Sequence, residues 1–227
     1  MGAERRGQYT TRLVYEREAL RYDHDRSRDL VERKWLEQFV TELPDAGAVL
    51  DLGCGAGEPI AGWLIENGYR VTGVDFALPL LELARERWPN GDWRVGDMRE
   101  LDLPERFDGI ICWDSFFHLT PDEQVSCIPI IARHLRLGGA LMLTVGPRAA
   151  ETTGAVGEGE VYHASLSPET YEKLFEASGL EVRAFCSEDP DCSNHSVLLG
   201  VKTVWGPPFG GPQGVAGLAG RRSNTAG

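Results

Sequence analysis

One segment constrains the fold more than any other: a short apolar run that ends in a glycine-rich turn. Residues 49–57 read V-L-D-L-G-C-G-A-G, which places glycine at every second position from Gly53 to Gly57. Glycines at alternate positions let the backbone bend sharply and approach a ligand closely, because no Cβ intervenes. The pattern predicts a buried strand that runs into a ligand-binding turn and then into a helix.

The rest of the chain continues this alternation of strand and helix. Residues 11–40 are expected to form an amphipathic helical lead-in, which Pro44 and Gly47 end. Strands are expected at 48–52, 70–74, 92–95, 108–112, 139–145, 180–186 and 196–204, and helices at 58–67, 78–87, 121–136 and from Ser167 to about Gly179. Such alternation predicts an α/β fold: a Rossmann-like, doubly wound, mostly parallel seven-stranded sheet with helices on both faces.

The sequence predicts three segments along the chain. Residues 1–40 are expected to be an N-terminal helical cap of the same domain, and residues 41–205 the main domain. Residues 206–227 are rich in glycine and proline without apolar periodicity, which predicts a disordered tail. Residues 148–164 are expected to be a long loop, either a lid or substrate loop or a merely flexible insertion.

The charge balance narrows the range of partners. Acidic residues number 35 against 23 basic ones, so the formal net charge is -12, which is a poor field for attracting nucleic acid or an anionic membrane. No apolar run suggests a signal peptide or a membrane span. Five scattered cysteines without CxxC spacing predict reduced thiols rather than disulfides or a zinc site. A cytoplasmic location is the resulting expectation.

An acidic residue at the end of the second expected strand points to a nucleoside. Asp75 closes the run V-T-G-V-D, and a carboxylate at this position can accept both hydrogen bonds of a ribose diol. A dinucleotide is the obvious rival ligand. Its fingerprint requires Gly or Ala where this chain has Glu58, and a carboxylate beside a pyrophosphate would be repelled. The turn therefore fits a cationic, phosphate-free ligand better.

With these residues in place, the chain resembles the class I methyltransferases that use S-adenosylmethionine, over roughly residues 15–145. The resemblance rests on D-L-G-C-G-A-G from Asp51, on Asp75-Phe76, on Gly96-Asp97-Met98, on residues 107–115 and on L-R-L-G-G-A-L from Leu135. It implies S-adenosyl-L-methionine as cofactor. The cofactor-binding residues it implies are Asp51, Gly53, Cys54, Gly55, Gly57, Asp75, Phe76, Asp97, Met98, Trp113 and Asp114.

The resemblance extends to an entry helix over Tyr15–Asp23, in which the family's tyrosines lie over the cofactor. We expect Tyr22 to bind the cofactor and leave the role of Tyr15 open. The two tyrosines are also spaced as one apolar face of a helix, so simple packing is the alternative interpretation.

Methyl transfer from a sulfonium needs a base only when the acceptor holds its proton, and His118 is the best-placed candidate. It follows the fourth strand, where ligands bind in open α/β sheets, but a structural histidine is the competing interpretation. Phe117, His118, Tyr162 and His163 are the expected substrate-binding residues. Asp114 could hold an ammonium group; a Mg²⁺ site would need further oxygen ligands, so no metal is expected.

The sequence thus predicts a methyltransferase that moves a methyl group by in-line displacement to N, O or S of a small molecule. A nicotinamide-dependent oxidoreductase and a non-catalytic S-adenosylmethionine-binding module are the alternatives. The expected partner is a small-molecule methyl acceptor rather than nucleic acid or membrane, for a monomer or homodimer.

Overall fold

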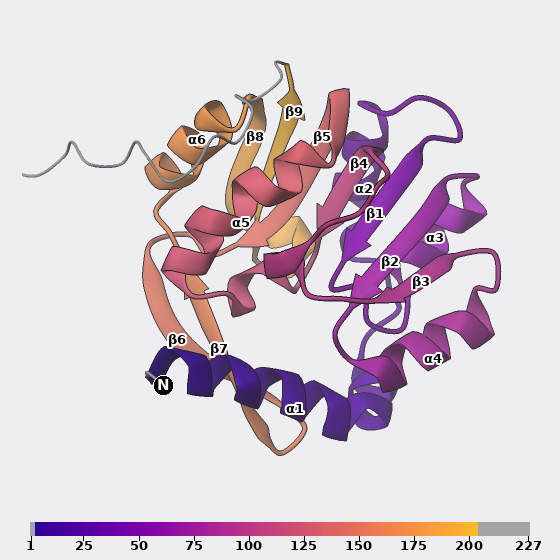
Figure 1. Cartoon of the computed structure of the whole chain (residues 1–227), viewed down its shortest axis with the longest axis vertical. Helices are drawn as coiled ribbons and strands as arrows, with labels where there is room; N and C mark the ends of the chain where they lie inside the picture. Colours follow the sequence, from indigo (N-terminus) through magenta and orange to yellow (C-terminus); the bar gives the residue numbers. More distant parts are fainter. Residues whose placement is uncertain (1–2, 204–227) are drawn as a thin grey trace, which may run out of the picture.

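The computed structural model describes the backbone of residues 3–203 and the side chains of residues 11–203. A seven-stranded sheet with the order β3-β2-β1-β4-β5-β9-β8 forms its centre (Figure 1). The strands are β1 Ala48–Leu52, β2 Arg70–Asp75, β3 Asp92–Val95, β4 Phe107–Cys112, β5 Leu135–Val145, β8 Leu180–Asp189 and β9 His195–Lys202. All neighbours pair in parallel except β9, which is antiparallel to both β5 and β8. The predicted fold class is confirmed.

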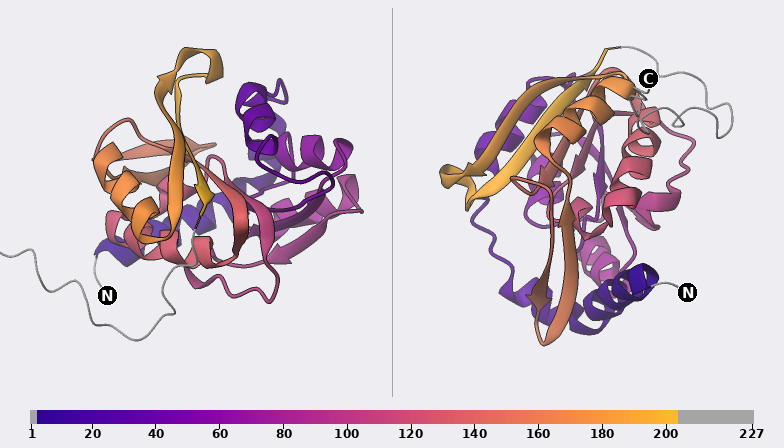
Figure 2. Two further views of the ribbon diagram at one scale, coloured as in Figure 1. Left: turned by 90° about the horizontal axis from the view of Figure 1, so that it is seen from above. Right: turned by 90° about the vertical axis from the view of Figure 1, so that its left-hand side faces the viewer.

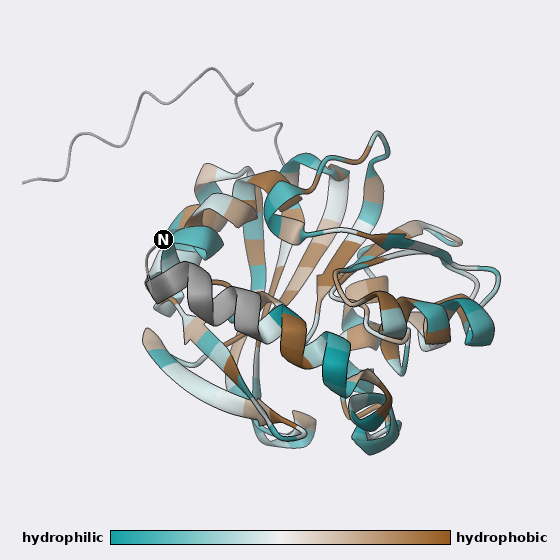
Figure 3. Ribbon diagram, turned by 60° about the horizontal axis from the view of Figure 1, so that its bottom comes forward, coloured by the Kyte–Doolittle hydropathy of each residue, from teal (hydrophilic) through white to brown (hydrophobic). Residues whose placement is uncertain are grey.

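Alternate side chains of the central strands enter two hydrophobic layers, one on each face of the sheet. Leu50 and Leu52 pack with α5 (Pro121–Arg133) and α6 (Pro168–Ala177). Val49 packs on the opposite face with α2 (Arg33–Val40), α3 (Ile60–Glu66) and α4 (Leu78–Arg87). Figure 3 shows the resulting concentration of apolar residues along the central strands. Because strands buried on both faces cannot shift register without exposing apolar groups, this core fixes the position of the loop after β1.

The N-terminal lead-in consists of two helices rather than one. Helix α1 spans Ala3–Asp25, residues 26–32 connect it to α2, and the two helices have different neighbours. Trp35, Leu36 and Phe39 of α2 are buried against the sheet. Helix α1 instead crosses the carboxyl ends of the strands (Figures 1 and 2). Since ligands bind at these ends in open α/β sheets, α1 lies directly over the expected site.

The prediction of a long loop at 148–164 is wrong, because this segment forms a β-hairpin. Strands β6 (Ala150–Val156) and β7 (Gly159–Ser165) pair antiparallel as a separate two-stranded sheet. Gly157 in the two-residue turn has a φ of 58°, which glycine adopts without strain. Val156 and Val161 pack on Val14 of α1, so the apolar face of the hairpin is completed by a helix far away in the sequence.

Two further boundaries differ from expectation. Helix α5 ends at Arg133 and β5 begins at Leu135, so that β5 includes the predicted turn before it. A shift in pairing between Phe107 and Gly109 accommodates the extra length, together with a left-handed Gly138. The predicted tail, 206–227, lies outside the described residues. Between residues 3 and 203, no helix is both long and apolar enough to cross a bilayer.

Candidate active site

The glycine-rich turn after β1 adopts a conformation that only glycine accommodates well. Gly53, Gly55 and Gly57 have φ values of 77°, 51° and 77°. A Cβ on Gly53 would lie 2.3 Å from the Cβ of Ser115, the residue that donates a hydrogen bond to the Leu52 carbonyl. The turn is therefore pressed against the loop after β4, and its backbone forms the floor of a cleft.

Asp75 braces this turn from the end of β2. One of its carboxylate oxygens accepts a hydrogen bond from the Gly55 amide at 2.9 Å, and the other accepts one from the Ala77 amide at 2.8 Å. Burial raises the pKa of the Asp75 carboxyl, while these backbone hydrogen bonds lower it. Asp75 thus has a structural role in the turn in addition to facing the cleft.

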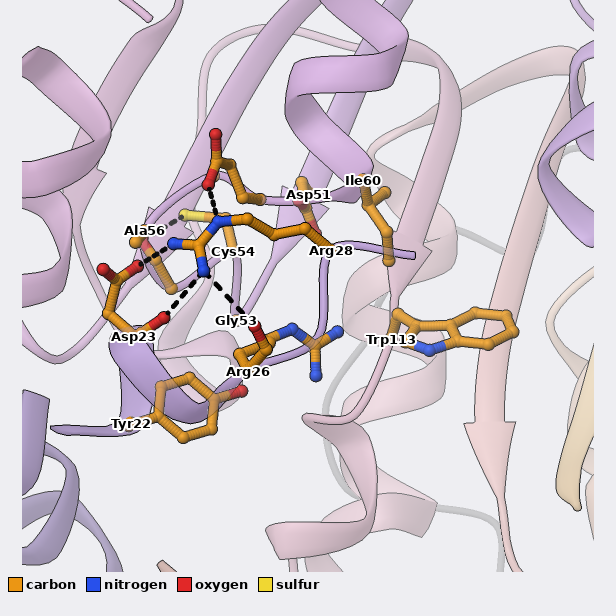
Figure 4. A pocket seen from close by; sticks show the side chains of 13 residues that line it. Tyr22, Asp23, Arg26, Arg28, Asp51, Gly53, Cys54, Ala56, Ile60 and Trp113 are labelled. Carbon is orange, nitrogen blue, oxygen red and sulfur yellow. Dashed lines mark hydrogen bonds and ion pairs between the residues drawn. The ribbon is translucent and has the colours of Figure 1, made fainter. Parts of the chain in front are cut away.

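The cleft has two connected parts that share Tyr22, Gly53 and Gly55. The smaller part encloses about 470 Å³ and is lined by Tyr22, Asp23, Arg26, Arg28, Asp51, Gly53, Cys54, Gly55, Ala56, Gly57, Glu58, Ile60 and Trp113 (Figure 4). The larger part encloses about 820 Å³, and its walls include Thr11, Tyr15, Asp75, Phe76, Asp97, Met98, Asp114, Ser115 and His118. An elongated ligand can extend from one part into the other.

Asp51 is the unusual group of the smaller part. Asp51 is nearly buried, at 4% exposure, and no hydrogen bond from the described residues reaches its carboxylate. Burial, together with the nearby Asp75, raises the pKa of Asp51 to about 7. A buried carboxylate without a partner is costly, so this side chain is suited to an incoming cation.

Salt bridges from Asp23 near the end of α1 and from Arg28 in the connection to α2 border the smaller part. Asp23 accepts two hydrogen bonds from Arg87, at 2.5 and 2.6 Å, and Arg28 Nε donates to Glu58 at 2.5 Å. The Arg28 guanidinium also pairs with Asp23 (Figure 4). Glu58 also lies 3.6 Å from Arg87. The charge of Glu58 is therefore compensated within the protein, so its repulsion of a pyrophosphate is weaker than the sequence alone suggests.

Asp114 joins three distant segments of the chain. It has a left-handed φ of 50°, and its amide donates to the Thr144 hydroxyl at 2.8 Å. Its carboxylate contacts Arg26 Nη1 at 3.1 Å and His195 Nε2 at 2.8 Å. Sequence reasoning missed Arg26 and His195, because neither belongs to a motif and only the fold brings them to the end of β4.

His118 lies at the base of the larger part, held at both ring nitrogens. Nδ1 is 2.9 Å from the Tyr162 carbonyl, which can only accept, so Nδ1 carries the proton. Nε2 then accepts from the Tyr15 hydroxyl at 3.0 Å. Burial lowers the pKa of His118 to about 4 and raises that of Tyr15 well above its usual value. The pair is neutral around pH 7, with the imidazole lone pair and the phenol at the cleft.

The tyrosines of α1 and the expected substrate residues occupy different places. Tyr22 packs edge-on against Tyr15, with ring centroids 5.1 Å apart, and both line the cleft. The rings of Phe117 and His163 pack against the His118 ring, with centroids 5.0 and 4.9 Å from its centroid. The Tyr162 hydroxyl donates to Glu151 on the hairpin. Among described residues, these last three shape the surroundings of His118 and are not part of either cleft lining.

At the far end of the larger part, Asp97 and Met98 lie side by side as the resemblance implies. The Asp97 carboxylate, however, already accepts hydrogen bonds from Arg99 Nε, at 2.9 and 3.1 Å, and from the Arg99 amide. These contacts hold the pKa of Asp97 below its usual value against the effect of burial. A ligand amino group would share this carboxylate with Arg99. All the sequence-predicted cofactor residues thus lie along one cleft.

Comparison with known proteins agrees with this geometry. A family model described as a methyltransferase domain matches residues 49–139. A dTDP-4-amino-2,3,4,6-tetradeoxy-D-glucose N,N-dimethyltransferase of Saccharopolyspora spinosa is 32% identical over 105 residues, covering 45% of this chain and 42% of that protein. The 27-O-demethylrifamycin SV methyltransferase of Amycolatopsis mediterranei is 31% identical over 172 residues, covering 64% and 62%.

The fold extends further than these sequence matches. The structure of an amino pentose methyltransferase from Micromonospora echinaspora, with S-adenosylmethionine bound, superposes with a TM-score of 0.64 at 21% identity, over 82% of this chain and 96% of that one. The sequence matches are shorter: the chain spans about half the length of the curated relatives it matches.

Proposed function

Since this chain belongs to the class I S-adenosylmethionine-dependent methyltransferases, we propose that it transfers a methyl group from S-adenosyl-L-methionine to N, O or S of a small molecule. The observation that carries the proposal is the unpartnered carboxylate of Asp51 beneath the left-handed Gly53–Gly57 turn, in a cleft that continues past Asp75. A cationic amino acid joined to a nucleoside has the length and charge distribution that this cleft accommodates.

The residues present fit the cofactor group by group. Asp51 would accept from the α-ammonium, and Arg26 in the same part of the cleft would pair with the α-carboxylate. The Gly53–Gly57 backbone would lie against the chain that joins this amino-acid end to the nucleoside. Asp75 and Phe76 would face the ribose, and Asp97 with Met98 the adenine. When bound, the cofactor supplies an electrophilic methyl group on a sulfonium that is already a good leaving group.

The protein's own contribution is orientation and proton removal. His118 presents a neutral Nε2 hydrogen-bonded to the Tyr15 hydroxyl, and both groups line the larger part of the cleft. An acceptor N–H or O–H that replaces this mutual contact would find an unprotonated imidazole ready to take its proton. Helix α1 covers the cleft and limits access of water. The named relatives, which act on an amino sugar and on a rifamycin oxygen, support a small-molecule acceptor.

Calorimetric titration with S-adenosylhomocysteine tests the proposal. We expect micromolar binding by the wild type and loss of at least about tenfold in Asp51→Asn, which keeps the shape of the side chain but removes its charge. Asp92→Asn, a carboxylate of the β3 edge that pairs with Arg94, is the matched control and should bind as the wild type does. Absence of binding by the wild type would refute the proposal.

Two further assays on the wild-type protein distinguish the proposed function from its alternatives. A nicotinamide-dependent oxidoreductase would bind NAD(P)H, whereas a non-catalytic module would bind S-adenosylhomocysteine yet release none from S-adenosylmethionine with any amine, phenol or thiol acceptor. A cytoplasmic location belongs to the proposal, supported by five unpaired cysteines. So does a state of monomer or homodimer, which sedimentation measures.

A further inference from the structure

In the charged cluster of Arg26, Asp114 and His195 beside the proposed cofactor site, His195 has no role in the chemistry described so far. His195 begins β9, and its ring is held at both nitrogens: Nδ1 is 2.8 Å from the Cys192 carbonyl, and Nε2 is 2.8 Å from the Asp114 carboxylate. Both partners are acceptors. Only the imidazolium, with a proton on each nitrogen, donates to both.

We propose that His195 is a positioning residue: as an imidazolium it fixes Asp114, and through Asp114 it holds Arg26 over the cleft. This inference rests on the proposed function, because the cleft is that of the cofactor. Asp114 shares its carboxylate between the two cations, with one oxygen toward His195 and the other toward Arg26 at 3.1 Å. Its left-handed backbone conformation is unfavourable for a non-glycine residue, so these contacts compensate for local strain.

The surroundings of His195 favour its charged form. Asp114 faces it from the end of β4, and Glu32, which precedes α2, lies 3.8 Å from Arg26. Among the described residues, Arg26 is the cation that pairs with both Asp114 and Glu32. The Trp113 ring lies against the imidazole, with centroids 5.4 Å apart, which suits a cation over an aromatic face. The hydrogen bond to Asp114 is the largest cause of a raised His195 pKa.

The element that carries His195 is itself anchored. Asp189, at the end of β8, accepts from Trp35 Nε1 at 2.8 Å and from Lys34 Nζ at 3.1 Å, both residues of α2. The loop between β8 and β9 is thereby fixed to the face of the sheet. His195 can therefore hold Asp114 in place, and its deprotonation would leave a ring nitrogen lone pair facing either the carboxylate or the Cys192 carbonyl.

Binding and protonation must then be coupled in both directions. If the ligand prefers the ordered cluster, affinity falls as pH rises through the His195 pKa, and bound ligand raises that pKa. S-Adenosylhomocysteine is the appropriate probe, because as a zwitterion it adds no net charge to the cleft. Asp51, whose pKa is raised to about 7, has the opposite effect on affinity, since its carboxylate must be ionised to bind an ammonium.

The test compares pH profiles of S-adenosylhomocysteine affinity for wild type, His195→Gln and the control His24→Gln, whose histidine is exposed on α1. As the pH rises from below to above the His195 pKa, the wild-type dissociation constant relative to that of His195→Gln should rise roughly tenfold. The control should match the wild type. A ratio of the two dissociation constants that stays the same across this pH change overturns the inference. A wild-type protein that does not bind S-adenosylhomocysteine at all overturns the proposed function instead.

NMR titration of the histidine ring signals of the wild type needs no variant and no turnover. The His195 pKa should lie above its usual value in the free protein and rise further with saturating S-adenosylhomocysteine. An unchanged His195 pKa on binding, in a protein that does bind, also overturns the inference.

Discussion

At the level of single residues, the site divides into positions that spacing reveals and positions that only folding assembles. Gly53, Asp51 and Asp75 are predictable because each has a fixed place in a local strand–turn–helix unit. Arg26 and His195 are not predictable in this way, because they contact Asp114 from positions 88 and 81 residues away, respectively. A side chain that acts through such a partner leaves no local pattern, and its role follows from geometry alone.

A comparison of Gly53 with Gly138 distinguishes two reasons for glycine at position 53: its backbone conformation and its close approach to Ser115. Gly53 and Gly138 have nearly the same φ, 77° and 78°, but a Cβ on Gly53 would meet Ser115, whereas one on Gly138 would meet nothing within 4 Å. We expect Gly138→Ala to lower the free energy of unfolding by about 1–2 kcal/mol and to leave S-adenosylhomocysteine binding intact.

Gly53→Ala should cost clearly more stability than this and abolish binding, because the turn must move away from Ser115. Chemical denaturation and calorimetry on both variants provide the measurement. Equal losses of stability in the two would show that backbone strain alone matters and that the close approach to Ser115 does not.

At the level of elements, the central sheet was predictable and the elements above it were not. Buried strands such as β1 and β4 stand out as apolar runs, because both their faces are covered. The hairpin β6–β7 has one face on α1 and the other largely exposed, so its residues appear polar and glycine-rich like those of a loop. Its strands depend on a tertiary partner, Val14, which sequence periodicity cannot supply.

The attachment of α1 to the sheet can be tested at Arg87. Its two hydrogen bonds to Asp23 join α4 to α1 beside the cleft, with both side chains partly buried. Arg87→Ala should weaken this attachment by about 1 kcal/mol, raise hydrogen exchange in the last turns of α1 and weaken S-adenosylhomocysteine binding severalfold.

Arg183→Ala removes an arginine that pairs with Glu181 on β8, far from α1, and is the control. Its exchange pattern in α1 and its affinity should equal those of the wild type. If Arg87→Ala also leaves α1 exchange unchanged, the salt bridge does not hold the helix.

At the level of the whole molecule, added salt has two opposite effects on the charged groups. The net charge of -12 creates self-repulsion that salt relieves. The salt bridges that Asp23 of α1 forms with Arg87 and Arg28, by contrast, weaken as salt screens them. Raising NaCl from about 0.05 to about 0.5 M shortens the screening length roughly threefold, which affects both.

We therefore expect the melting temperature to rise with salt while hydrogen exchange in α1 accelerates and that in β1 and β4 does not. Differential scanning calorimetry and exchange mass spectrometry on the same samples measure the two effects. In Arg87→Ala the acceleration should be smaller, since one of the screened contacts is already gone. Slower α1 exchange at high salt in the wild type would contradict this account.

The arrangement of α1 and the hairpin has a consequence for how such a protein can diversify. The family model matches residues 49–139, which include the turn, Asp75 and Asp97, whereas α1 and β6–β7 lie on either side of this stretch. The two outer segments pack on one another through Val14, Val156 and Val161. Because each segment covers the apolar face of the other, we expect them to change together rather than separately. Recombination at three junctions, one after α1 and one on each side of the hairpin, could then change the acceptor surface while the Gly53–Gly57 turn, Asp75 and Asp97 are kept.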